Sequence, residues 1–114
     1  MKKTIFIISC LFFVFISCKP DCDWLANNHR SQECLIIVDE LSPATTTTMS
    51  IKGISLVDGT YTVSDENQRW WQLYRDQIER GDTIIKRKGE LTFNIHKKDT
   101  ILSYKWECEG KVYE

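Results

Sequence analysis

The segment GDTIIKRKGELTFNIHKKDTILSYKW, residues 81–106, decides the fold of this chain. Its middle part places Leu91, Phe93 and Ile95 at alternate positions, with polar residues between them. Such alternation is typical of a strand with one buried and one solvated face. Turn residues precede and follow this strand, so the segment predicts a three-stranded antiparallel meander with one solvent-facing side.

Further strands are expected upstream of this meander. The run Cys34–Val38 is short, β-branched and bounded by acids, which indicates a buried strand. Met49–Val57 alternates, with a bulge or bend expected at Gly53. Asp58-Gly59 is a strong hairpin signal, and the residues that follow it supply the return strand.

One amphipathic helix is predicted over Glu66–Arg80. At about 100° per residue, its apolar side chains fall within one arc and most charged side chains lie outside it. Trp70, Tyr74 and Ile78 are expected to pack on the sheet, whereas Trp71 lies at the edge of the arc and is a candidate contact residue. The expected fold class is therefore α+β: a small, mostly antiparallel sheet of roughly five or six strands with one amphipathic helix packed on it.

The N-terminus has the three parts of a secretory signal. A basic start at Met1–Thr4 precedes the apolar run Ile5–Ile16, and the small residue Ser17 precedes Cys18. The apolar run is shorter than the roughly 20 residues that a permanent membrane-spanning helix needs. We therefore expect a cleaved signal peptide rather than a retained transmembrane anchor.

The segment Phe15-Ile16-Ser17-Cys18 resembles the lipobox of bacterial lipoproteins, although that motif usually has Leu where this chain has Phe15. The resemblance implies lipid attachment at Cys18 and cleavage before it. A rival site ends at Cys10, but cleavage there would leave too short an apolar run. Alternatively, Cys18 joins a disulfide in an ordinary secreted protein. The expected organisation is a signal peptide over 1–17, a lipidated tether and N-terminal polar segment over 18–33, and a single domain over 34–114.

Resemblance also suggests a location. Inner-membrane lipoproteins of Gram-negative bacteria tend to have Asp directly after the lipidated cysteine, and this chain has Lys19. The resemblance therefore implies a lipid-anchored protein of the cell envelope, at the outer membrane, with the face left open. Gly81–Lys86 fits a Gly-Asp-Ser/Thr-Ile-x-Lys pattern and resembles small uncharacterised Gram-negative envelope lipoproteins. That likeness transfers no activity and no functional residue.

Three cysteines remain beyond Cys18, which allows one disulfide and one odd thiol. We favour Cys34 with Cys108, because each flanks a predicted strand, and rank Cys22 with Cys34 second. A metal site of Cys22, His29 and Cys34 is disfavoured, since no CxxC pair is present.

Charge argues against a nucleic-acid partner. Removal of residues 1–17 takes away Lys2 and Lys3, so the formal net charge falls from −1 to about −3. A nucleic-acid-binding protein would need a basic face. The basic clusters Lys86–Lys88 and Lys97-Lys98 are expected to be solvated turn residues at opposite ends of one strand.

No catalytic motif is present, so we expect no enzyme, no catalytic residue, no metal and no cofactor. His96 and Asp99 are the least implausible participants if there is chemistry. The leading hypothesis is a non-catalytic binding or structural module with a membrane attachment through its lipid and a protein or envelope-polymer partner. The alternative is an inhibitor or immunity-type lipoprotein that blocks a cell-wall hydrolase with the loop Ser42–Thr48.

Overall fold

The computed structural model describes residues 21–43, 45–66 and 69–114, and these form an α+β fold as expected. Cys18 and the signal peptide lie outside the described residues. In chain order the elements are α2 (Cys22–Ser31), β1 (Cys34–Leu41), β2 (Ser50–Ser55), β3 (Tyr61–Asp65), the 3-10 helix η1 (Trp71–Gln77), β4 (Thr83–Lys86), β5 (Thr92–His96), β6 (Ile101–Lys105), β7 (Glu107–Cys108) and β8 (Lys111–Val112).

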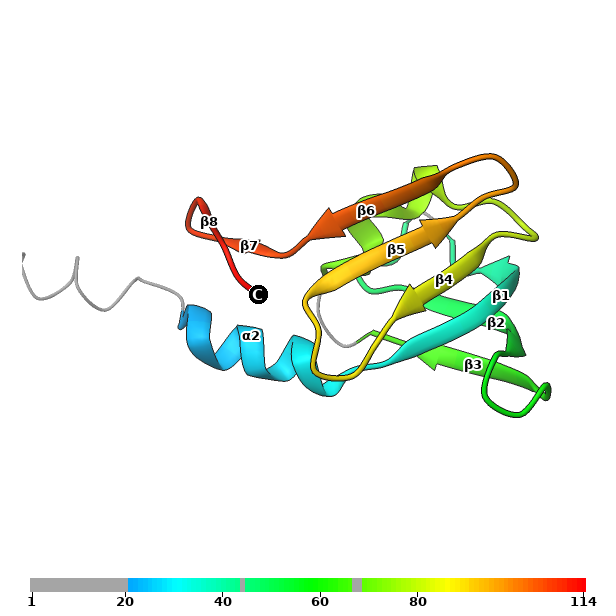
Figure 1. Ribbon diagram of the computed structural model, residues 1–114, viewed down its shortest axis with the longest axis horizontal. Coiled ribbons are helices and arrows are strands. Elements are labelled where there is room, and N and C mark those ends of the chain that lie inside the picture. The colour runs from blue at the N-terminus through cyan, green and yellow to red at the C-terminus, as the bar shows by residue number, and fades with distance from the viewer. Residues whose placement is uncertain (1–20, 44, 67–68) are drawn as a thin grey trace, which may run out of the picture.

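Six strands form one antiparallel sheet in the order β3-β2-β1-β4-β5-β6, and β7 and β8 form a separate hairpin (Figure 1). The turn at Asp58-Gly59 joins β2 to β3, and Ile54 pairs with Tyr61. The expected hairpin and the expected β4-β5-β6 meander are both confirmed. At the centre, β1 pairs with both β2 and β4.

The core lies on one face of this sheet, against the segment that carries η1. The rings of Trp71 and Tyr74 stack on Phe93 at centroid distances of 5.8 and 5.6 Å. Burial of large aromatic and aliphatic side chains is the main stabilising term in a domain of this size. The buried apolar residues are Ala26, Cys34, Ile36, Val38, Met49, Ile51, Trp70, Trp71, Ile78, Ile84, Leu91, Phe93, Ile95 and Trp106.

The prediction of an α-helix over Glu66–Arg80 is wrong, because the described part of this segment forms only the 3-10 helix Trp71–Gln77. A carboxyl oxygen of Glu66 accepts a hydrogen bond from the Trp71 amide at 2.6 Å. At the other end, the Gly81 amide donates to the carbonyl of Val38 in β1. Contacts at both ends thus hold the segment in a short, tight helix, and tertiary structure overrides its α-helical propensity.

The α-helix α2 begins within the segment expected to be a tether and polar lead-in. Asp21 caps the helix, since its side chain accepts a hydrogen bond from the Trp24 amide at 3.0 Å. Ala26 and His29 are buried against the core. From residue 21 onward, this segment is therefore an ordered part of the domain, which starts before residue 34.

The favoured pairing of Cys34 with Cys108 is wrong. The disulfide joins Cys22 to Cys108, whose Cα atoms are 5.9 Å apart. Cys34 is a free, fully buried thiol on the core face of β1. Burial raises its pKa to about 12, so it stays protonated and unreactive. The disulfide fixes the start of α2 to the C-terminal hairpin.

Lys86 is not the solvated turn residue that its basic neighbours suggested. Its side chain is fully buried, and Nζ donates to the carbonyls of His29 and Gln32, each at 2.5 Å. These carbonyls lie at the C-terminal end of α2, where backbone acceptors lack partners within the helix. Lys86 therefore caps α2 and holds it against β4.

Gly53 is required by a close approach of β1. A Cβ atom at this position would overlap the carbonyl oxygen of Ile37 and lie 3.1 Å from the Asp39 amide. The register of β1 and β2 shifts just beyond, between Val38 and Glu40. The bend expected near Gly53 therefore corresponds to an irregularity on the neighbouring strand.

Gly53→Ala is expected to lower the free energy of unfolding by about 1–3 kcal/mol or more, because the added methyl meets backbone rather than a movable side chain. Urea unfolding followed by tryptophan fluorescence measures the loss. Lys52→Ala, at the adjacent exposed position of β2, is the control. Equal unfolding midpoints for the two variants would contradict the packing described.

Candidate functional site

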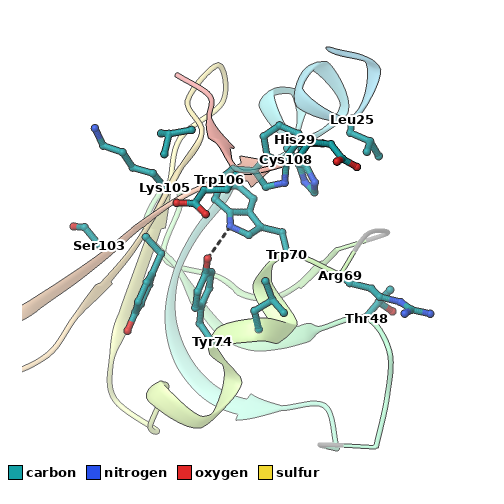
Figure 2. Close-up of a pocket in the computed structure, with 15 residues that line it drawn as sticks. Leu25, His29, Thr48, Arg69, Trp70, Tyr74, Ser103, Lys105, Trp106 and Cys108 are labelled. Carbon is teal, nitrogen blue, oxygen red and sulfur yellow. Dashed lines mark hydrogen bonds between the residues drawn. The ribbon is translucent and has the colours of Figure 1, made fainter. Parts of the chain in front are cut away.

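A groove of about 1090 Å³ lies where α2, η1, β6 and the β7–β8 hairpin meet (Figure 2). We call it the aromatic groove. Its walls include Leu25 and His29 from α2, Leu73 and Tyr74 from η1, Tyr104 from β6 and Val112 from the hairpin.

Two tyrosines and a tryptophan form one wall of the groove. Trp70 Nε1 donates a hydrogen bond to the Tyr74 hydroxyl at 3.2 Å, drawn as the dashed line in Figure 2. Tyr74 stacks on Tyr104 at a centroid distance of 4.1 Å, with the rings 10° from parallel. This network fixes the ring orientations and keeps half-buried aromatic surface at the groove wall.

His29 is held among aromatic rings at the back of the groove. Its ring centroid lies 5.2 Å from both Trp70 and Trp106. Burial, and then the nearby positive charge of Lys86, lower the His29 pKa to about 4. The imidazole is therefore neutral at physiological pH and packs as an aromatic side chain.

Aliphatic side chains project at the mouth of the groove, with charged residues beside them. Leu73 is 73% exposed and Val112 is 42% exposed, although both are apolar. Arg69, Lys105 and Glu107 add charge of both signs. Exposed aliphatic groups beside a concave aromatic wall favour binding of a ligand with apolar side chains.

The edge strand β6 supplies backbone as well as side chains to the groove. Lys97 N donates to Thr100 O at 2.8 Å, and Trp106 N donates to Leu91 O at 3.0 Å. Antiparallel pairing alternates, so even-numbered residues of β6 direct their backbone groups toward β5.

The odd-numbered residues of β6 consequently direct their amides and carbonyls away from β5. Ser103 and Lys105 are two of these residues, and both line the groove. In the described sheet, β6 pairs with β5 alone. Its outer edge is therefore a backbone hydrogen-bonding surface that adjoins the groove.

Of the residues singled out from sequence, His29, Trp70, Tyr74 and Cys108 line this groove, and the candidate contact and catalytic residues do not. Trp71, the candidate contact residue, is fully buried against Phe93, so that prediction is wrong. His96 pairs with Ile101 at the far end of β6, and Asp99 is exposed in the β5–β6 turn. Leu73, an apolar residue of the segment predicted as an amphipathic α-helix, is an exposed groove residue. Its exposure follows from the 3-10 geometry of η1.

The described residues bring no three His, Cys, Asp or Glu side chains together in a cluster that could hold a metal ion. The three side chains considered for a metal site each have another environment. Cys22 is in the disulfide, Cys34 is buried in β1, and His29 packs between tryptophans.

Glu66 is a buried carboxyl group that bonds to the start of η1, and it predicts a pH dependence of stability. Burial raises its pKa to about 8 from an ordinary 4.5. Between these values the folded state binds more protons than the unfolded state, so stability falls as pH rises. The lowered pKa of His29 makes stability rise with pH, but only between about pH 4 and pH 6.5. The lowered pKa of Lys86, about 8, makes stability rise with pH only above 8.

Stability is therefore expected to fall between pH 6.5 and 8, by up to about 1.4 kcal/mol per pH unit for one proton. Glu66→Gln should remove this fall, because its amide does not titrate and its oxygen can still accept from the Trp71 amide. Glu79→Gln, an exposed position, is the matched control. Urea unfolding at both pH values provides the measurement, and an unchanged pH profile in Glu66→Gln would contradict the assignment.

No helix within the described ranges is long and apolar enough to cross a membrane. Comparison of the chain with protein-family models, curated proteins and solved structures finds no match.

Proposed function

We propose that this chain is a lipid-anchored protein of the bacterial cell envelope and a non-catalytic binding module, whose aromatic groove receives an extended polypeptide segment of a protein partner. The observation that carries the binding role is the edge strand β6 in the wall of a groove with exposed aliphatic residues. Strand addition at a sheet edge supplies affinity through backbone hydrogen bonds, and an adjoining apolar pocket supplies specificity.

The proposal of a lipid anchor is supported by the N-terminal sequence. A basic start, a short apolar run and Ser17-Cys18 match a lipoprotein signal. Changing Cys18 to Ala is expected to abolish labelling by a palmitate analogue in the producing cells. Label that persists in this variant would refute lipidation at Cys18.

Peptide binding can be tested without a known partner, by display selection of linear peptides on the full chain in detergent. The selected peptides should bind at least about tenfold more weakly to Leu73→Glu, which corresponds to about 1.4 kcal/mol. Val57→Glu, at a 72% exposed position in the β2–β3 turn, should bind them like the parent protein. Failure to select any peptide, or equal binding by Leu73→Glu, would contradict the proposal.

A second candidate is an inhibitor of a cell-wall hydrolase, and the arrangement of the β1–β2 loop favours it. The Thr46 amide donates to Pro43 O at 3.1 Å, and the Ser50 amide donates to the Ser42 hydroxyl at 3.1 Å. Arg75 Nε also donates to Ser42 O at 2.8 Å. The described residues of the loop thus make hydrogen bonds before any partner binds, and groups fixed in advance lose little entropy on entering an active site. Unchanged lysozyme-type hydrolase activity at micromolar protein would rule out this role.

A further inference from the structure

The start of α2 carries an exposed aromatic residue where the chain approaches the proposed lipid anchor. Trp24 lies in the first turn of the helix and is 61% exposed. The other three tryptophans are at most 7% exposed. The indole of Trp24 packs little against its own domain, so most of its ring can contact a partner molecule or a membrane.

The covalent chain limits how far Trp24 can lie from Cys18. Asp21 already caps the helix and is three residues beyond Cys18, so their Cα atoms are at most about 11 Å apart. One helical turn adds about 5 Å. Trp24 therefore lies within roughly 16 Å of the proposed lipid-bearing residue, about half the roughly 30 Å thickness of the hydrocarbon core, so the tether keeps the indole near the bilayer surface.

The disulfide brings a second segment to the same end. Cys22 is joined to Cys108, so the β7–β8 hairpin lies beside the first turn of α2 (Figure 1). The turn between β2 and β3 lies at the opposite end of the domain. One end of the molecule is thus defined by α2 and the hairpin, and it adjoins the proposed anchor.

We infer that this end rests on the bilayer, with Trp24 inserted in the lipid headgroup layer, and that the domain is thereby held in one orientation. The inference depends on the proposed lipid anchor at Cys18. Tryptophan is the side chain best suited to this layer, because its ring is apolar and its N–H remains hydrogen-bonded. The exposed ring of Trp24 thus contacts the lipid bilayer and not another protein.

The charges around Trp24 indicate which kind of lipid headgroup its insertion requires. The acids Asp21, Asp23, Glu107 and Glu109 outnumber the bases Lys19 and Lys111 in the segments next to the proposed anchor, so attraction to anionic lipid does not drive the contact. A bilayer of zwitterionic lipid therefore supports the insertion of Trp24, and high salt does not weaken it. Leu25 and Val112 also line the aromatic groove, whose mouth then opens close to the membrane surface.

Fluorescence quenching by brominated lipid tests this orientation. The lipidated full chain is reconstituted into vesicles of phosphatidylcholine brominated in its acyl chains, and its emission is compared with that in unbrominated vesicles. We expect quenching of the parent protein, unchanged at high salt, and loss of that quenching in Trp24→Phe. As a matched control, Val57→Trp in the Trp24→Phe background places an exposed indole at the opposite end and should stay unquenched.

Two outcomes separate the inference from the anchor on which it depends. A lipidated protein that floats with the vesicles but is not quenched, or is quenched equally in Trp24→Phe, overturns the orientation and leaves the anchor standing. A protein that carries no lipid when isolated from the producing cells overturns both.

Discussion

Removal of the Cys22–Cys108 disulfide, by Cys22→Ser or Cys108→Ser, is expected to lower the free energy of unfolding by about 4–5 kcal/mol. The two cysteines are 86 residues apart in sequence, so the bond closes nearly the whole domain into one loop. Closing a long loop removes many conformations from the unfolded chain, and this is the main source of stabilisation in the chain-entropy model. The loss is a large share of the 5–15 kcal/mol typical of a small domain.

Urea unfolding of the mature protein, with and without reductant, measures this contribution. Reduction of the parent protein should lower its free energy of unfolding by about as much as the substitution Cys22→Ser does. Cys34→Ala is the control, because it removes a thiol that is buried but unpaired and keeps the disulfide. Thiol counting on the denatured chain should find one free thiol. Three free thiols, or a disulfide that includes Cys34, would contradict the pairing.

Trp71→Ala is expected to cost about 3–5 kcal/mol, the range for loss of a large aromatic side chain from a core. Trp71 is completely buried and stacks on Phe93 at 5.8 Å. The alanine variant would leave a cavity between η1 and β5 that the sheet cannot close. Sequence periodicity alone places this residue at the edge of the apolar arc, as a candidate contact residue.

The control for Trp71 is Leu73→Ala, two residues along the same helix. Leu73 is 73% exposed, so its truncation should change stability by less than about 0.5 kcal/mol. Urea unfolding of both variants, monitored by far-ultraviolet circular dichroism, gives the comparison. If Leu73→Ala were the more destabilising change, the orientation of η1 in the structure would be wrong.

The strands could be predicted from sequence because their signals are local. Alternation at Leu91, Phe93 and Ile95 and the turn at Asp58-Gly59 survive unchanged in the structure, since each depends on a few neighbouring residues. The α+β class follows from these signals together with a segment of helical periodicity.

The helices could not be predicted in the same way, because long-range contacts decide them. Residues 22–31 have few apolar side chains, and their helix depends on the Asp21 cap, the disulfide and the Lys86 ammonium group at its end. The segment around Trp71 has an α-helical pattern but is held by Glu66 and β1 in a 3-10 helix. Neither outcome is encoded in local periodicity.

The aromatic groove was missed for the same reason. Its residues come from α2, η1, β6 and the C-terminal hairpin, and no local motif links them. Trp70 and Tyr74 were recognised, but as core residues only. Their hydrogen bond and the stacking on Tyr104 depend on a contact between η1 and β6 that sequence spacing does not reveal.

Intact mass of the protein extracted from membranes tests the central claim, a disulfide-closed domain anchored through lipid on Cys18. We expect the mass of residues 18–114 plus a diacylglyceryl group and an N-linked acyl chain, less two hydrogens for the disulfide. Reduction should add back those two hydrogens. The mass of an unmodified chain, or of one cut at another residue, would contradict the account.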